Sequence, residues 1–166
     1  MVDVMAMVAR TLTVDIPTLS ESQVAAVLGD VAGLRRWLDG VEVACAGRLE
    51  QLAADDPSLF PEQITAKATG RGLRDGARAA ARAKTAAAVT PLGDALAAGT
   101  ISGEHLDAVT AALRDLTPAQ RALLAGRGEQ LALSAGASTP EEFRRHLAKT
   151  ARQICADDGI ARLERQ

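Results

Sequence analysis

The apolar positions of this chain recur at helical spacing along most of its length. Met5, Val8 and Leu12 lie three and four residues apart, which predicts a short helix over residues 2–13. Runs of Val, Ile, Thr and aromatic residues, which favour strands, are absent. The pattern therefore predicts an all-α fold.

A heptad pattern marks one much longer helix near the N-terminus. Ser20 and Gln23 have the spacing of a capping box and place its start, and the expected helix covers about residues 20–54. Apolar residues fill positions a and d of successive heptads, with Arg48 as the one interruption. This heptad seam, interpreted as an oligomer or helix-packing seam, consists of Val24, Val27, Val31, Leu34, Leu38, Val41, Cys45 and Leu52.

Small residues form a second pattern on the opposite face of the same helix. Gly33, Gly40 and Gly47 recur every seven residues, in register with Ala26 and Ala54. A glycine inside a helix costs about 1 kcal/mol relative to alanine. We therefore expect another helix to cross this face closely, and a self-dimerising heptad seam is compatible with that arrangement.

Capping and helix-breaking residues divide the rest of the chain into short helices. The sequence predicts a multi-helix bundle with one long N-terminal helix and five to six shorter ones, organised as residues 1–56 and 57–166 in one folded unit. The shorter elements are a helix over Pro61–Thr69, a turn at residues 70–72, a helix over about 73–89 with an alanine core face, and four helices that begin near Thr90, Ser102, Thr117 and Thr139.

The composition agrees with helices throughout. Hydrophobic residues make up 48% of the chain and aromatic residues only 2%, and 35 of the 166 residues are alanine, the best helix former. The basic residues are 16 arginines and 3 lysines, and asparagine is absent, a usage typical of GC-rich bacterial genomes.

Charge is distributed unevenly, although the net charge is only -2. Residues 1–66 carry -6, residues 67–84 carry +5 and residues 85–166 carry -1. The basic segment spans a glycine-containing turn and the start of a helix, the outline of a helix-turn-helix whose second helix reads double-stranded DNA. The candidate nucleic-acid-binding residues are Lys67, Arg71, Arg74, Arg78, Arg82 and Lys84, with Arg74, Arg78 and Arg82 as the strongest.

Two other interpretations of the basic segment stay open. Its arginines can pair within the molecule with the acidic N-terminal helix. They can also bind an acidic protein partner.

Residues for catalysis are few. The two histidines, His105 and His146, lie on separate helices without metal-ligand spacing, and each is expected at the surface or its boundary. Cys45 and Cys155 are expected to be buried, reduced thiols. The sequence predicts no enzyme activity, no metal, no cofactor and no apparent small-molecule substrate. It also predicts no membrane segment and no signal peptide, which indicates a cytoplasmic location.

The stretch from Pro91 to Leu106 resembles a signature of the thirteen-E-twelve repeat family, an actinobacterial helical domain of unknown function. The shared features are a proline, a short Ala/Leu helix, Gly99, the Ile101-Ser102 pair and His105 within a helix. The residues from Thr139 to Arg145 and from Asp157 to Gly159 are similar to that family as well, so the resemblance covers about residues 65–166.

This resemblance implies an association with HNH endonucleases, because the helical domain commonly precedes such a module. An HNH module needs a ββα fold with metal-binding histidines. No such segment occurs in these 166 residues, so the module would lie beyond residue 166. The resemblance transfers no catalytic residue, and together with the basic segment it favours a DNA-binding or nuclease-accessory role. The alternative, which follows from the heptad seam, is an oligomerising interaction module.

Overall fold

The computed structural model describes the backbone of residues 3–163 and the side chains of residues 3–157. Within these residues all regular structure is helical, as the sequence predicts. The elements are α1 (Val4–Leu12), a 3-10 turn η1 (Ile16–Thr18), α2 (Glu21–Asp55), α3 (Pro61–Thr69), α4 (Leu73–Ala88), α5 (Thr90–Ala97), α6 (Gly103–Arg114), α7 (Pro118–Ala125), α8 (Gly128–Gly136) and α9 (Pro140–Leu163).

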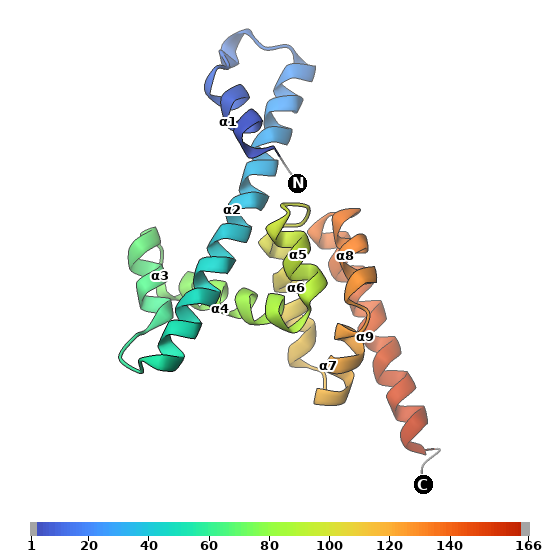
Figure 1. The fold of residues 1–166 in the computed structure, drawn as a ribbon. Coiled ribbons are helices and arrows are strands. Elements are labelled where there is room, and N and C mark those ends of the chain that lie inside the picture. Colours follow the sequence, from blue (N-terminus) through green and yellow to red (C-terminus); the bar gives the residue numbers. More distant parts are fainter. Residues whose placement is uncertain (1–2, 164–166) are drawn as a thin grey trace.

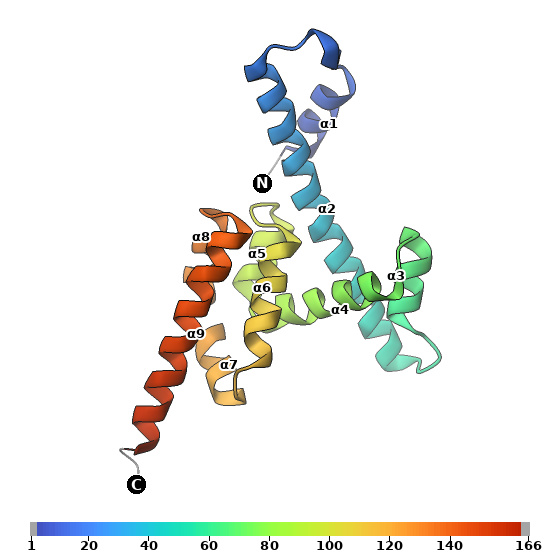
Figure 2. The same ribbon diagram turned by 180° about the vertical axis from the view of Figure 1, so that it is seen from behind.

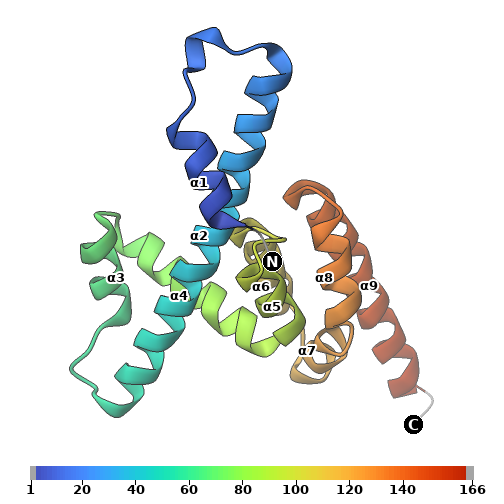
Figure 3. The ribbon, with the colours of Figure 1, turned by 45° about the horizontal axis from the view of Figure 1, so that its top comes forward.

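The long helix α2 connects two regions of the molecule (Figure 1). Its N-terminal half stands out from the rest and is flanked by α1, whereas its C-terminal half packs against α3, α4 and α5. Seen from behind, α4 runs from α2 to α6 (Figure 2). Tilting the molecule shows α8 and α9 side by side at the opposite edge from α2 (Figure 3).

The hydrophobic core lies around α6. Leu106 and Val109 of this helix are fully buried, and they share one cluster with Phe143 and Leu147 of α9. Further large members of the cluster come from α5, α7, α8, α9 and the links on either side of α6, among them Leu92, Leu96, Leu124, Leu131, Ile154, Ile101 and Leu116. The arrangement makes α6 the central helix of the C-terminal region.

The glycine face of α2 forms the close helix crossing that the sequence predicts. A Cβ atom at Gly40 would lie 2.8 Å from the Leu96 carbonyl oxygen of α5, and one at Gly33 would lie 2.8 Å from the Met7 Cε of α1. Gly47 faces Ala83 of α4. Three helices therefore approach this face of α2, and the approach is closest at Gly40, where a side chain would meet the backbone of α5.

The heptad seam is not a packing seam within the chain. The buried residues of α2 are Gly33, Gly40, Val43 and Ala46, and none belongs to the seam. Leu38 is 55% exposed, and Val24, Val41 and Leu52 are exposed as well. Because the glycine face permits the closest approach, the neighbouring helices pack there. Along the heptad seam they leave Val24, Leu38, Val41, Cys45 and Leu52 exposed, whereas Val27, Val31 and Leu34 are half-buried.

The predicted helix starts are confirmed. Capping boxes are present at Ser20, Thr117 and Thr139, and α4 buries Ala79, Ala80 and Ala83 as its core face. One predicted helix is divided, because the pattern that begins at Thr117 breaks between α7 and α8. At the start of α8, Gly128 packs closely against Pro91 and Val89, and a Cβ atom there would lie 3.1 Å from each side chain.

The expected burial of the two cysteines was wrong. Cys45 and Cys155 are free thiols but are exposed. Cys45 is exposed because it belongs to the open heptad seam.

No helix in the described part of the chain is long and apolar enough to cross a membrane.

The close crossing at Gly40 gives a direct prediction. We expect Gly40→Ala to lower the free energy of unfolding by roughly 1–3 kcal/mol, because its Cβ meets backbone atoms of α5 that cannot rotate away. Gly29→Ala is the matched control, since nothing lies within 4 Å of a Cβ there. This control should raise stability by up to about 1 kcal/mol. Urea unfolding of both variants measures the effect, and equal stabilisation by both would show that α2 and α5 are not in close contact.

Candidate nucleic-acid interface

The basic segment predicted from the sequence forms α3, a tight turn and α4. Gly70 ends α3 in the left-handed conformation, with φ of 68°, and Gly72 precedes the first residue of α4. Gly76 of α4 packs directly on the backbone of Glu62 in α3. The two helices therefore form the rigid pair that the sequence indicates.

The surroundings of α4 differ from those of a DNA recognition helix. This helix packs against α2, α3, α5 and α6, and it buries Gly76, Ala79, Ala80, Ala83 and Thr85. A recognition helix needs a free face that enters the major groove. The exposed residues of α4 are Leu73, Arg74, Ala77, Arg78, Lys84, Ala87 and Ala88, so this helix is covered on one side and open on the other.

The six candidate residues divide into three groups. Arg71 and Lys84 are exposed but pair with carboxylates of α2, at 3.1 Å to Glu42 and 2.9 Å to Glu50. These pairs agree with the intramolecular interpretation of the basic segment.

The side chains of the remaining four candidates differ in whether they form ion pairs or hydrogen bonds within the protein. Arg78 makes only a long contact of 3.8 Å with Asp75 of its own helix. Arg74 and Lys67 have no ion pair or hydrogen bond of their side chains among the described residues. The last candidate, Arg82, is held firmly within the protein.

Arg82 joins α4 to α6 through a bidentate ion pair. Its Nε and Nη2 atoms donate to the two carboxylate oxygens of Asp107 at 2.8 and 2.7 Å, and its side chain is only 13% exposed. The hydrogen bonds to Asp107 raise the pKa of the Arg82 guanidinium above its ordinary value, against the opposing effect of burial. Arg82 is therefore a structural residue, and its geometry does not leave it available to a phosphate.

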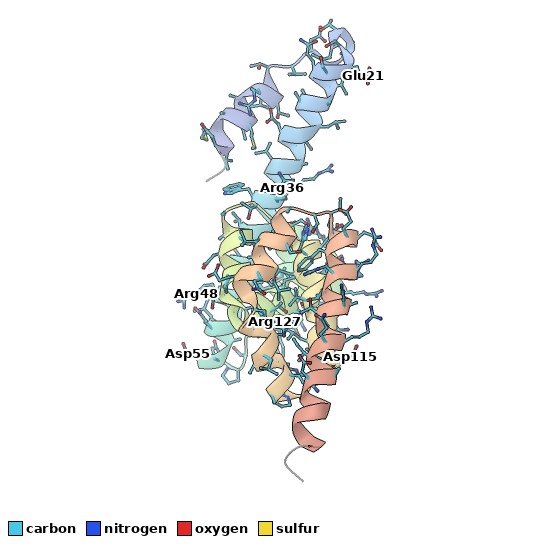
Figure 4. The ribbon with its side chains drawn as sticks, turned by 90° about the vertical axis from the view of Figure 1, so that its right-hand side faces the viewer. Glu21, Arg36, Arg48, Asp55, Asp115 and Arg127 are labelled. Atoms are coloured by element: carbon cyan, nitrogen blue, oxygen red, sulfur yellow. The ribbon has the colours of Figure 1, made fainter. Side chains whose placement is uncertain are left out.

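The N-terminus of α6 collects further polar contacts around this pair. The guanidinium of Arg82 passes directly over Gly103. The Gly103 N–H donates to Asp39 Oδ2 of α2 at 2.8 Å, and Arg36 Nε donates to the Gly99 carbonyl at 3.0 Å. In the side view, Arg36 lies where α2 leaves the C-terminal region (Figure 4). Asp39 thus occupies the position at this helix N-terminus where an anion is favourable.

His105 completes the cap of α6 and is buried, contrary to the expectation of a surface position. The Ser102 N–H donates to His105 Nδ1 at 3.2 Å. Because Nδ1 is an acceptor, the proton of the neutral ring lies on Nε2, which donates to the Ser138 carbonyl at 3.2 Å. Both ring nitrogens therefore hold the fold together, whereas His146 is exposed as expected.

A cleft of about 960 Å³ lies beside this network, between α2, the start of α6 and the link from α8 to α9. Its lining carries equal numbers of opposite charges. The cations are Arg35, Arg36, Arg71 and Arg82, and the carboxylates are Asp39, Glu42, Glu104 and Glu142. The balance gives this cleft no preference for an anionic or a cationic ligand.

The open side of α4 faces a different groove, of about 760 Å³, between α4, α6 and α9. Arg74 and Arg78 line it together with Arg114 of α6 and Arg144 of α9. Sequence reasoning missed the last two, because they lie 36 and 66 residues beyond Arg78 and only the fold brings them beside it. Single arginines on two distant helices gave no local signal.

This groove continues into two neighbouring ones. Arg114 also lines a groove between α4, α6 and α7, and Arg144 also lines one between α6 and α9. We call the combined surface the arginine face. It carries seven cations, Arg74, Arg78, Lys84, Arg114, Arg121, Arg144 and Arg152, against the four carboxylates Glu104, Asp107, Asp115 and Glu141. This surface is thus positive although the chain as a whole is negative.

No family model, curated protein or solved structure matches this chain. Membership of the thirteen-E-twelve repeat family therefore stays a prediction. The residues that suggested it have clear structural roles, since Gly99 has φ of 70°, Ile101 is fully buried and His105 caps α6. Within the described part of the chain, no three His, Cys, Asp or Glu side chains are grouped as metal ligands.

The role of Arg82 can be separated from that of its neighbours. We expect Arg82→Ala to reduce the free energy of unfolding by roughly 2 kcal/mol, because it leaves Asp107 without its bidentate partner. Arg78→Ala, one turn earlier and exposed, should change stability by less than about 0.5 kcal/mol. Thermal unfolding followed by circular dichroism compares the two variants. If both substitutions lowered the stability equally and only slightly, the ion pair of Arg82 with Asp107 would not stabilise the fold.

Proposed function

We propose that this chain is a non-catalytic domain that binds double-stranded DNA through the arginine face. The observation that supports the proposal is the groove in which Arg74 and Arg78 of α4 meet Arg114 and Arg144 of α6 and α9. If the family resemblance holds, this surface would serve an HNH nuclease module as a DNA-holding accessory.

The available arginines suit phosphate binding. Arg74 and Arg114 have no ion pair among the described residues, and Arg78 and Arg144 have exposed partners on their own helices. Exposed ion pairs of this kind contribute about 0–1 kcal/mol, so a phosphate can replace the carboxylate at little cost. Four guanidinium groups are therefore open to a nucleic-acid backbone.

Small side chains between the arginines allow close approach. Ala77 and Ala81 of α4 and Ala111 of α6 line the groove. Bulky side chains at these positions would hold a phosphate backbone away from the guanidinium groups. Because contacts to phosphate carry no direct sequence information, binding through this face should depend weakly on base sequence and strongly on salt.

Titration of a labelled duplex against the protein at about 50 and 200 mM salt tests the proposal. Each lost phosphate contact should reduce the slope of log affinity against log salt by about 0.9. The double variant Arg74→Gln and Arg78→Gln should therefore bind more weakly and with a slope smaller by roughly 2.

The matched control is the double variant Arg35→Gln and Arg48→Gln. It removes the same charge from exposed positions on α2, outside the arginine face. It should bind DNA with nearly the affinity and salt slope of the natural chain. Absence of binding at the lower salt concentration, or equal losses in both double variants, would contradict the proposal.

The open heptad seam favours a second function, self-association through α2. Leu38, Val41 and Leu52 are exposed on one face of this helix, and large apolar patches on a surface are typical of interaction sites. Burying a leucine in an interface contributes about 1.5–3 kcal/mol. Burial of these side chains against a second copy of α2 would therefore favour pairing.

Sedimentation equilibrium measures this second function. A concentration-dependent dimer is expected for the natural chain, and Leu38→Asp should shift it toward monomer because a buried, unpaired carboxylate is strongly unfavourable. Leu133→Asp is the control, since Leu133 is exposed on α8 away from the seam. A natural chain that stays monomeric at high concentration would exclude self-association.

A further inference from the structure

A groove of about 590 Å³ between α4, α6 and α7 has an apolar floor. Val89 and Leu113 line it together with alanines of α4 and α7. The hydroxyl groups of its two threonines are both hydrogen-bonded. The Thr110 hydroxyl donates to the Leu106 carbonyl. The Thr85 hydroxyl must therefore be the donor in its 2.6 Å hydrogen bond with Thr110. An apolar ligand body can therefore lie on this floor without leaving a buried hydroxyl donor unpaired.

The charged residues of this groove all have the same sign. Lys84, Arg114 and Arg121 line it, and no carboxylate does. The Arg121 Nε donates to the Leu113 carbonyl at 2.8 Å, and no other hydrogen bond or ion pair of Arg114 or Arg121 occurs among the described residues. The groove thus combines an apolar floor with guanidinium groups that lack a counterion, which is complementary to an amphipathic anion.

The size of the groove decides between a small ligand and a protein partner. It extends along α4 from Ala81 to Ala88, a length of about 10 Å at 1.5 Å per residue. A stable protein interface buries about 800 Å² on each partner, far more than a groove of this length offers. Its volume lies within the range of small-molecule sites, about 300–1,000 Å³.

We propose that this groove binds a medium-chain organic carboxylate, with the apolar chain along the floor and the carboxylate at Arg114 and Arg121. The proposal does not rest on DNA binding. Arg114 lines both grooves, but this groove has its own apolar floor, and Arg121 lies outside the groove that contains Arg74 and Arg78. It also extends the sequence-based expectation, which identified no small-molecule ligand.

Isothermal titration with octanoate tests the proposal, using 1-octanol and butyrate as ligand controls. We expect saturable binding of one octanoate per chain. Octanol should bind at least tenfold more weakly because it lacks the charge that the guanidinium groups pair with. Butyrate should also bind more weakly, because each lost methylene group removes about 0.8 kcal/mol of burial.

Two pairs of variants locate the site. Arg114→Gln with Arg121→Gln should weaken octanoate binding at least tenfold, whereas Arg35→Gln with Arg48→Gln should not change it. Ala122→Phe should block the groove, whereas Ala119→Phe, exposed on the same helix but outside the lining, should not. Circular dichroism confirms that the variants fold. Absence of saturable binding, equal affinity for octanol, or binding unchanged by Ala122→Phe would overturn the proposal.

Discussion

The ion pair between Arg82 of α4 and Asp107 of α6 is the contact on which the arrangement of the helices most depends. The core face of α4 consists of alanines, and each buried methyl contributes only about 0.8 kcal/mol, so apolar packing orients this helix weakly. The bidentate geometry at 2.7 and 2.8 Å fixes the orientation instead. Asp39 ties the adjoining Gly103 to α2, so one polar network holds three helices.

This network also decides which arginines face outward. Arg74, Arg78 and Arg82 are four residues apart, and each such step turns about 40° around an α-helix. Arg82 is therefore rotated by about 80° from Arg74, which places it against α6 while the other two remain at the open side. The same contact with α6 brings Arg114 beside them, and the packing of α9 on α6 adds Arg144. The arginine face thus arises from residues that lie far apart in the sequence.

Local signals in the sequence were sufficient to predict where the helices begin, but not which helices pack against one another. Capping boxes and prolines predict the starts of α3, α7 and α9, because these effects act within one turn of the chain. The glycine repeat predicts a close crossing at Gly40, but nothing local identifies α5 as the helix that crosses. The burial of Arg82 and His105 was missed for the same reason, since their partners Asp107 and Ser138 become visible only in the fold.

Backbone amide exchange with and without duplex DNA tests most directly whether the arginine face is the nucleic-acid interface. We predict slower exchange in the first two turns of α4, around Arg114 and around Arg144 when DNA is bound at low salt. The amides of α2 near Arg48 should be unaffected. Protection confined to α2, or no protection anywhere on the arginine face, would contradict the account.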